Sequence, residues 1–486
     1  MNIEKKILPR SYSQFFIGGQ WVNPSSDTKI ELKYPHDQSV FGSVALAAEA
    51  DIDAAVDAAY KALHSGPWPG MKPEERQTII ERFIELHHPQ VSEFAELITL
   101  ENGSPIWFTG MLQDLLKIQS EALLRAAKNT EWEIRQPTYA GERVIRREPV
   151  GVVAAIIPWN VPKQSALIKV VQALLAGCTV VLKPTPATAP DSLALGELFK
   201  AAGLPDGVLN IVPADREVSE YLVGHPKVNK IAFTGSTVAG KKIAAIAGSQ
   251  MKRASMELGG KAAAIILEDA DLAAAVESLK FGSFVNSGQS CFAKTRVLAP
   301  RAKYEQIVTA LSEMVSGLSI GDPFQPENFI GPMVNKQQYD KVRNYIQIGL
   351  QEGARLVTGG LDLPTGDGLE NGWYIRPTLF ANVNNQMRIA REEIFGPVLT
   401  VIPFNTIEEA IEIANDSDYG LCAAVFSGDK EVALDISRHI QAGSISINGA
   451  FIDFDSPFGG YKQSGIGREA GTYGIEEFTE LKAVTL

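Results

Sequence analysis

The stretch VGVVAAIIPWNVPKQSALIKVVQALLAGCTVVLKP, residues 150–184, decides the fold class of this 486-residue chain. Two short apolar runs, at residues 151–157 and 179–182, consist mostly of Val, Ile, Leu and Ala, as buried strands do. The segment between them is rich in Ala and Leu and favours a helix. A strand, a helix and a second strand in this order predict a βαβ unit and therefore a parallel sheet.

The same rhythm continues outward along the chain. Apolar runs at residues 208–212 and 230–233 complete a first series, and a second series extends from residue 262 to about residue 454. The runs of the second series lie at residues 263–267, 398–402, 423–426 and 444–447. We therefore predict two α/β domains, with the chemistry in the crevice between them.

The segments before residue 150 have a different character. Residues 15–22 predict a short strand region, and residues 51–65 and 73–102 carry apolar residues at the spacing of amphipathic helices. In residues 131–150, polar and apolar residues alternate and no helix is favoured. We expect this last segment to be a strand excursion that lies outside the core.

Composition excludes several classes of protein. The 45 basic and 57 acidic residues give a net charge of −12, which argues against a nucleic-acid binder. No window approaches about 18 apolar residues without a charge, so we expect no membrane span and no signal peptide. The histidines show no metal-ligand spacing. Three cysteines are too few for a disulfide framework and fit a reducing compartment, so a cytoplasmic enzyme is expected.

The sharpest local signal is a cysteine among small residues, Gly288-Gln289-Ser290-Cys291, after a predicted helix at residues 272–286. Gly288 allows the backbone to approach a ligand, and a cysteine activated by a base is a strong nucleophile. By spacing alone, a buried structural thiol is an equal alternative. Cys178 and Cys422 lie in apolar strand contexts, and we expect both to pack in the core.

Two polar residues could assist such a nucleophile. Glu257 lies between Met256 and the Leu258-Gly259-Gly260 run, where it could act as a general base or, alternatively, as a capping or salt-bridged residue. Asn160 follows the first strand, where open α/β folds bind ligands. Its amide could stabilise an oxyanion, and the alternative is an ordinary turn asparagine.

Glycine-rich stretches offer one candidate phosphate site. Residues 235–242 nearly match a P-loop, but Lys242 stands where the magnesium-binding Ser or Thr is required, so ATP hydrolysis is rejected. Residues 465–471 do not fit the dinucleotide fingerprint, and we predict a loop there. The turn at Thr234, Gly235 and Ser236 joins a strand to a helix, and free amides at that helix N-terminus suit a phosphate.

Taken together and in order, these motifs resemble the aldehyde dehydrogenase family, of the non-phosphorylating, hydrolytic kind. The resemblance runs over essentially the whole chain. The matching segments are FIGGQW at residues 16–21, Pro158-Trp159-Asn160, Lys183-Pro184, Phe233-Thr234-Gly235-Ser236, Glu257-Leu258-Gly259-Gly260, Gly288-Gln289-Ser290-Cys291, Glu393-Ile394-Phe395-Gly396-Pro397 and Pro457-Phe458-Gly459-Gly460.

The resemblance implies a role for each matching residue. Cys291 would attack the aldehyde carbon, with the Asn160 amide and the Cys291 backbone amide holding the oxyanion. Glu257 would activate the water that hydrolyses the thioester, and Lys169 would take part in proton relay. NAD or NADP would be held by the remaining matching residues, which are Ile156, Pro158, Trp159, Lys183, Gly235, Ser236, Leu258, Glu393 and Phe395. No metal is implied.

The form of the cofactor stays open at this point. NAD-preferring relatives often carry an acid one to three residues after Lys183-Pro184, but here no carboxylate occurs before Asp191. An acid there would repel a 2′-phosphate. Its absence leaves Lys183 free to bind that phosphate, so NADP is allowed beside NAD.

The aldehyde also stays open. The positions expected to line the substrate tunnel are residues 161, 163–165 and 451–454. Lys163 and Gln164 are more polar than the residues common there in relatives that act on aliphatic aldehydes. Either the substrate is polar or acidic, or Lys163 points to solvent.

The resemblance further implies a Rossmann-like cofactor domain (residues 1–130 and 150–258), a second α/β catalytic domain (residues 259–467) and a small β extension (residues 131–149 and 468–486). Through this extension subunits would join as a homodimer or homotetramer.

The sequence argues against three other functions. Glu257 argues against a coenzyme A-acylating relative, the presence of all three catalytic residues argues against a silent scaffold, and no histidine motif supports a cysteine hydrolase.

Overall fold

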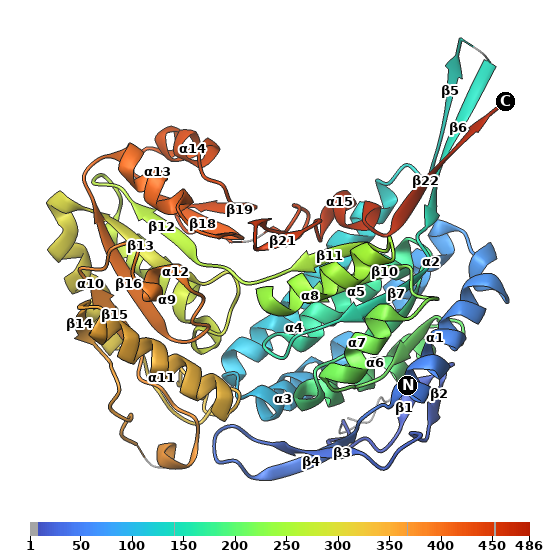
Figure 1. The fold of residues 1–486 in the computed structure, drawn as a ribbon, viewed down its shortest axis with the longest axis horizontal. Helices are drawn as coiled ribbons and strands as arrows, with labels where there is room; N and C mark the ends of the chain where they lie inside the picture. Colours follow the sequence, from blue (N-terminus) through green and yellow to red (C-terminus); the bar gives the residue numbers. More distant parts are fainter. Residues whose placement is uncertain (1–7, 140, 367, 452) are drawn as a thin grey trace.

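Two large, mostly parallel sheets make up the fold, one in each of two lobes (Figure 1). The structure is a computed structural model that describes residues 8–139, 141–366, 368–451 and 453–486. Two predictions fall partly outside the described residues. These are the expected absence of a signal peptide, which involves residues 1–7, and the tunnel position Ile452. The predicted α/β class, with a Rossmann-like first sheet, is confirmed.

The first sheet has eight strands, and five of them are parallel. Its parallel strands lie in the order β9-β8-β7-β10-β11, so the chain starts in the middle at β7, fills one side and then crosses to the other. In sheet order the strands are β2 (Gln20–Val22), β1 (Phe15–Ile17), β9 (Leu209–Ile211), β8 (Thr179–Lys183), β7 (Val152–Ile156), β10 (Lys230–Thr234), β11 (Arg253–Glu257) and β21 (Gly465–Ile466). The reversal of strand order between β7 and β10 is the place where such sheets bind ligands.

Both faces of the first sheet are covered by helices. Along β7, Val153 and Ala155 face one apolar cluster, whereas Val152 and Ala154 face another. This alternation explains why the whole strand is apolar, since a parallel sheet is buried on both sides. The covering helices are α1 (Glu49–His64), α2 (Pro73–His87), α3 (Val91–Asn102), α4 (Ile106–Lys128), α5 (Pro162–Leu175), α6 (Ala189–Ala201), α7 (Arg216–Gly224) and α8 (Thr237–Ser249).

The second sheet has seven strands, and six of them are parallel. In sheet order they are β14 (Arg355–Thr358), β15 (Thr378–Ala381), β16 (Val398–Phe404), β13 (Lys294–Pro300), β12 (Ala262–Ile266), β18 (Cys422–Phe426) and β19 (Ser444–Ile447). Its helices include α9 (Leu272–Phe284), α10 (Tyr304–Ser316), α11 (Lys336–Gln351), α12 (Arg388–Arg391), α13 (Ile407–Asn415) and α14 (Lys430–Arg438). They likewise bury both faces of the sheet.

Several predictions about elements need correction. The predicted helix at residues 73–102 is two helices, because Pro89, two residues after the end of α2, has no backbone N–H to continue the hydrogen bonding of that helix. The predicted loop at residues 465–471 contains β21, which pairs with β11 across the boundary drawn at residue 258. Central strand β13 was not predicted. The division into domains itself stays a prediction.

A small third sheet projects away from both lobes (Figure 1). It joins β5 (Glu133–Thr138), β6 (Gly141–Pro149) and β22 (Thr479–Thr485), with β6 in the middle. β22 follows the short helix α15 (Gly471–Glu476) and carries the C-terminal end of the chain. The remaining strands form two small pairs, β3 (Lys29–Lys33) with β4 (Val40–Ala45), and β17 (Tyr419–Gly420) with β20 (Tyr461–Lys462). In the described part of the chain, no helix is long and apolar enough to span a bilayer.

Candidate active site

The predicted site residues gather at the carboxyl ends of the first sheet. β7 ends at Ile156 and leads into Pro158, Trp159 and Asn160, and the parallel strand β10 ends at Thr234. Glu257 is the last residue of the next strand, β11, in register with Thr234. Parallel strands place their carboxyl ends at one edge, so residues from three segments meet there.

The loop of residues 285–291, which carries the predicted nucleophile Cys291 (the nucleophile loop), reaches this edge of the first sheet from the other lobe. After α9, three consecutive residues take left-handed backbone conformations: Asn286 (φ 53°), Ser287 (φ 56°) and Gly288 (φ 72°). A Cβ atom at Gly288 would lie 2.3 Å from the carbonyl oxygen of Gly396. Gly288 is therefore required both for its backbone conformation and for the close packing of this loop on the Glu393–Pro397 motif.

Cys291 sits at the end of this loop as a half-buried free thiol. Burial raises the pKa of the Cys291 thiol, and the neighbouring Cys422, Glu393 and Glu257 raise it further. Its own backbone N–H acts in the opposite direction and lowers this pKa. The free enzyme therefore holds a neutral thiol, and a base must remove its proton before attack.

The side chain of Asn160 faces the nucleophile loop. Its Nδ2 donates to the carbonyl oxygen of Gln289, two residues before Cys291, at 3.0 Å. The backbone carbonyl oxygen of Asn160 accepts hydrogen bonds from Asn286 Nδ2 at 3.1 Å and from Asn102 Nδ2 at 3.3 Å. Ser104 Oγ donates to Asn286 Oδ1 at 2.5 Å and completes the network.

This network joins α3, the turn after β7 and the nucleophile loop, so it fixes the position of Asn160 relative to Cys291. Asn102, Ser104 and Asn286 were missed by the sequence argument. The signal that could have suggested Asn286 is its place just before the Ser287-Gly288-Gln289-Ser290-Cys291 run. For Asn102 the sequence offered no comparable signal.

Glu257 is buried, and its Oε2 atom has no hydrogen-bond partner among the described residues. Burial raises the pKa of Glu257 well above its ordinary value, and Glu469 raises it further, whereas Lys169 and Arg468 lower it. A Cβ atom at Gly459 would lie 2.7 Å from Glu257 Oε1, so this glycine leaves the space that the carboxylate occupies. A carboxylate with a raised pKa and a free oxygen is suited to accept a proton.

Lys169 lies on α5, is completely buried, and acts electrostatically on Glu257. Its ammonium group donates to Thr234 Oγ1 at 2.6 Å and forms an ion pair with Glu469. Glu469 comes from the C-terminal part of the chain, 300 residues away, and no motif in the sequence pointed to it. Its charge acts on Glu257, so the two carboxylates and Lys169 form one electrostatic unit.

The turn between β10 and α8 provides free backbone amides. Ser236 caps α8, and its Oγ accepts from Ala239 N at 3.3 Å. In the described structure, no hydrogen-bond acceptor is recorded for the amides of Thr237 and Val238, the first two residues of α8. A Cβ atom at Gly235 would lie 2.5 Å from the Phe233 ring, which explains the glycine. The free amides of this helix start fit the diphosphate of a dinucleotide.

Residues from both lobes face each other beside this turn. The rings of Trp159 and Phe395 meet edge to face with centroids 5.5 Å apart, and Phe395 has a left-handed backbone (φ 61°). The half-buried carboxylate of Glu393 accepts a hydrogen bond from Gly260 N at 3.0 Å. A Cβ atom at Gly259 would lie 2.5 Å from Glu393 Oε2, so the glycine pair lets the two motifs approach.

Two further predicted cofactor residues lie close by. The side chain of Leu258 packs against Gly240 on α8, where a Cβ atom would lie 2.5 Å from a Leu258 methyl carbon. Lys183 ends β8 and is buried, and burial lowers its pKa to about 8. Asp191 is also buried and its amide donates to Glu101 Oε1, so its carboxylate belongs to the interior.

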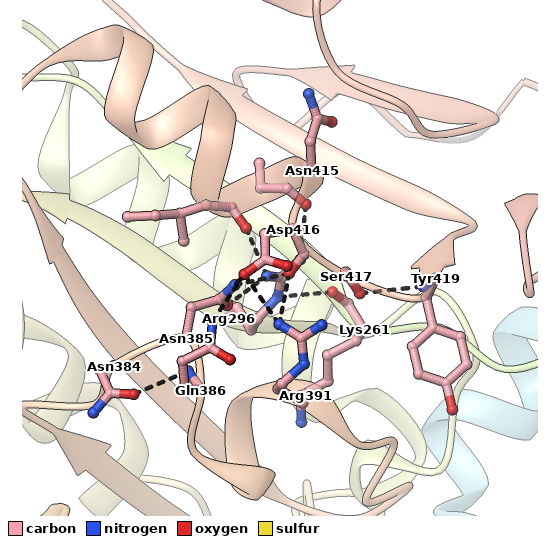
Figure 2. Close-up of polar contacts among 12 residues, drawn as sticks. Lys261, Arg296, Asn384, Asn385, Gln386, Arg391, Asn415, Asp416, Ser417 and Tyr419 are labelled. Atoms are coloured by element: carbon pink, nitrogen blue, oxygen red, sulfur yellow. Dashed lines mark hydrogen bonds and ion pairs between the residues drawn. The ribbon is translucent and has the colours of Figure 1, made fainter.

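A buried arginine anchors the segment that carries the Gly259–Gly260 pair (Figure 2). Arg296 Nε donates to the carbonyl oxygen of Lys261 at 3.0 Å, and its other nitrogens donate to Asn385 Oδ1 and to the carbonyl oxygens of Ile413 and Ala414. Asp416 accepts from Asn385 and from Arg391 on the same side. The start of β12 is thereby tied to the end of α13.

Of the two alternatives for Lys163, the structure rules out the one in which Lys163 points to solvent. Its side chain is 1% exposed, and its ammonium group lies over the ring of Phe94. The charges of Asp191 and Glu101 oppose the lowering of the Lys163 pKa that burial causes. Interior carboxylates therefore explain its polarity, and Lys163 is no sign of a polar substrate.

Comparison with known proteins agrees with this geometry. The sequence model of the aldehyde dehydrogenase family matches residues 21–484. Geranial dehydrogenase of Castellaniella defragrans is 42% identical over 480 residues, covering 98% of this chain and 99% of that protein. 3-Succinoylsemialdehyde-pyridine dehydrogenase of a Pseudomonas species is 41% identical over 480 residues, covering 98% of each chain.

Solved structures agree equally well. The structure of a Mycobacterium tuberculosis aldehyde dehydrogenase with NAD+ has a TM-score of 0.95 and 44% identity, covering 98% of each chain. A variant of aldehyde dehydrogenase C from Pseudomonas syringae, in complex with NAD+ and octanal, has a TM-score of 0.94 and 38% identity, covering 99% of this chain and 98% of that one.

The fold and these comparisons define an NAD(P)-dependent aldehyde oxidoreductase. The chain belongs to the aldehyde dehydrogenase family, as its resemblance implied.

Proposed function

We propose that the protein oxidises an aldehyde to the carboxylic acid with NAD+ or NADP+, by way of a thiohemiacetal and a thioester on Cys291. The observation that carries this proposal is the meeting of Cys291, Asn160 and Glu257. The Asn160 amide contacts the nucleophile loop, and the charge of Glu257 acts on the Cys291 thiol. These three residues supply the nucleophile, the oxyanion donor and the base.

In the first step, Glu257 takes the proton of Cys291 and the thiolate attacks the aldehyde carbon. The oxygen of the thiohemiacetal becomes negative and accepts from Asn160 Nδ2, which exchanges its contact with the Gln289 carbonyl oxygen for this one. The backbone amide of Cys291 would be the second donor. Loss of one such donor typically costs about 2.7–4 kcal/mol of transition-state stabilisation.

Collapse of the oxyanion then expels a hydride from the same carbon and leaves a thioester. When bound, the nicotinamide is the hydride acceptor. The amides at the start of α8, with Gly235 and Ser236, would hold the diphosphate, and Glu393 would hold the ribose. Ile156, Pro158, Trp159, Leu258 and Phe395 would form the walls that position the ring and the adenosine.

Hydrolysis of the thioester completes the reaction. Once its first proton has left, Glu257 takes a proton from water, and the resulting hydroxide attacks the acyl carbon while Asn160 again stabilises the oxyanion. The C–S bond then breaks, so that the carboxylic acid leaves and Cys291 is released as the thiolate. Lys169 and Glu469 lie next to Glu257 and provide a route by which this proton can leave. Glu257 also separates this function from that of coenzyme A-acylating relatives, in which a thiol replaces the water.

We propose an aldehyde with an apolar tail. Phe292, next to the nucleophile, packs against the cluster of Phe108, Leu112 and Val285, together with Trp107 and Met111. With Lys163 buried in the interior, this cluster beside Cys291 is made of apolar side chains. Geranial and octanal, named for two relatives, have tails of this kind, whereas a third relative is named for a pyridine semialdehyde.

Three finer proposals complete the assignment. Lys183 and the absence of an acid at residues 185–190 support use of NADP beside NAD. Subunits associate through the projecting sheet of β5, β6 and β22, whose outer strands are free to add to a second sheet. Three unpaired cysteines support a reducing compartment, the cytoplasm.

The test is reduced-nicotinamide formation from a panel of aldehydes with NAD and NADP in parallel, for the wild type and Cys291→Ala. We expect octanal and geranial to give higher kcat/KM than succinic semialdehyde, and Cys291→Ala to give no activity. Coenzyme A is added in a parallel arm. Acyl-coenzyme A formation in place of the free acid would overturn the hydrolytic assignment, and activity retained by Cys291→Ala would overturn the nucleophile.

A further inference from the structure

A second thiol lies beside the nucleophile. Cys422, the first residue of β18, forms a small apolar cluster with Ala262 and Leu421, and Cys291 and Phe292 pack against this cluster. After burial, the Cys422 thiol is the largest influence that raises the pKa of the Cys291 thiol. The mechanism proposed above uses Cys291 alone.

Backbone packing holds the two segments together. A Cβ atom at Gly260 would lie 2.6 Å from the carbonyl oxygen of Cys291 and 3.4 Å from Leu421 Cβ. The nucleophile loop and the residue before Cys422 therefore both pack against this one glycine. Because Ala263 pairs with Ala423, Cys422 also lies next to Ala262 in the sheet.

The two thiols differ in access. Cys291 is half-buried, whereas Cys422 is 5% exposed and lies within the cluster. A small oxidant can reach Cys291 first, and the nearest partner for the oxidised sulfur is then Cys422. The third cysteine is remote from this pair, since Cys178 donates to the carbonyl oxygen of Phe478.

We propose that Cys291 and Cys422 form an intramolecular disulfide when the enzyme meets a hydroperoxide, and that this reversible bond protects the nucleophile from irreversible oxidation. The bond itself does not depend on the proposed function, because it requires only the two thiols.

The chemistry balances in two steps. The Cys291 thiolate attacks hydrogen peroxide, the O–O bond breaks, and Cys291 sulfenic acid and one water form once protons are counted. The sulfur of Cys422 then attacks the sulfenic sulfur, the S–S bond forms, the S–O bond breaks and a second water leaves with the Cys422 proton. Two thiols are oxidised by two electrons, and one peroxide is reduced to two waters. Without Cys422, further peroxide carries Cys291 to the sulfinic acid, which thiols do not reduce.

The test treats the full-length protein with hydrogen peroxide, blocks the remaining thiols and identifies tryptic peptides by mass. We expect peptide 281–294, which contains Cys291, to be linked to peptide 392–430, which contains Cys422, with the loss of two hydrogens. Dithiothreitol should separate the peptides and restore aldehyde oxidation. This wild-type measurement needs no variant and remains decisive even if the proposed activity is absent.

Variants sharpen the result. Cys422→Ala should keep basal activity, but after peroxide its activity should not return with dithiothreitol, and peptide 281–294 should carry two added oxygens. Cys178→Ala is the matched control and should behave as the wild type. An oxidised but unlinked peptide 281–294 in the wild type, or full recovery by Cys422→Ala, would overturn the proposal.

Discussion

The carboxylate of Glu257, as the proposed base, should set the pH dependence of kcat. Burial and Glu469 raise its pKa, and below that pKa it is protonated and cannot act as a base. The kcat of the wild type should therefore rise with pH. Lys169 lowers the pKa of Glu257, so removing its charge should raise that pKa and shift the acid limb of the pH–kcat profile to higher pH.

This prediction is tested with Lys169→Met, and Lys169→Arg serves as the control that keeps the charge. Full pH profiles of kcat are compared, because a purely structural defect would lower kcat at every pH without moving the limb. An unshifted limb in Lys169→Met would show that Lys169 does not act on the base.

Lys183 gives a second prediction at the residue scale. Its pKa is lowered to about 8, so the free enzyme loses this charge as pH rises through 8. If the ammonium group binds the 2′-phosphate of NADP, the KM for NADP should rise between pH 7 and 9.5 while the KM for NAD stays level. Lys183→Met should abolish this difference. Parallel changes in the two KM values would contradict the assignment.

At the scale of elements, the left-handed backbone of residues 286–288 after α9 positions the proposed nucleophile, Cys291. Asn286→Gly keeps a residue that tolerates φ 53° but removes the amide that joins Asn160 to Ser104. We expect kcat to fall, by up to about 100-fold for a displacement near 1 Å, with little change in the KM for the cofactor.

Met251→Gly is the matched control, because Met251 also has a left-handed backbone (φ 55°) but is exposed and lies outside the site. Its kcat should equal that of the wild type. Unaltered kcat in Asn286→Gly would mean that the backbone alone holds Asn160 in place.

Strand periodicity predicted most strands of both sheets, because a strand buried on both faces must be apolar throughout. β7, β8, β10, β16 and β19 lie within or next to the predicted runs. β13 was missed because it begins with Lys294 and contains Arg296, and this arginine is buried only because backbone oxygens and Asn385 surround it. A contact of that kind cannot be seen in local sequence.

At the scale of the whole molecule, the projecting sheet predicts the state of assembly. Leu481 on β22 is 67% exposed, which is unusual for a large apolar residue on a sheet that stands clear of both lobes. Leu481→Glu should therefore lower the molar mass measured by light scattering during size-exclusion chromatography. Leu363→Glu changes an exposed apolar residue outside the projecting sheet and should leave the molar mass unchanged. Equal masses for the two variants would argue against this sheet as the interface.

The sequence by itself determined the α/β class and the positions of most strands, and it singled out Cys291, Glu257 and Asn160 as candidate site residues. The alternation of short apolar runs with helices and the order of the motifs are properties of the sequence, so both can be recognised without the tertiary structure. Tertiary structure decided the rest. Glu469 reaches Lys169 across 300 residues, Asn102 and Asn286 meet at Asn160, and Cys422 lies beside Cys291. Lys163 likewise comes under the influence of the Asp191 and Glu101 charges only in the folded chain. Such contacts depend on how sheets and loops pack, and no spacing along the chain encodes them.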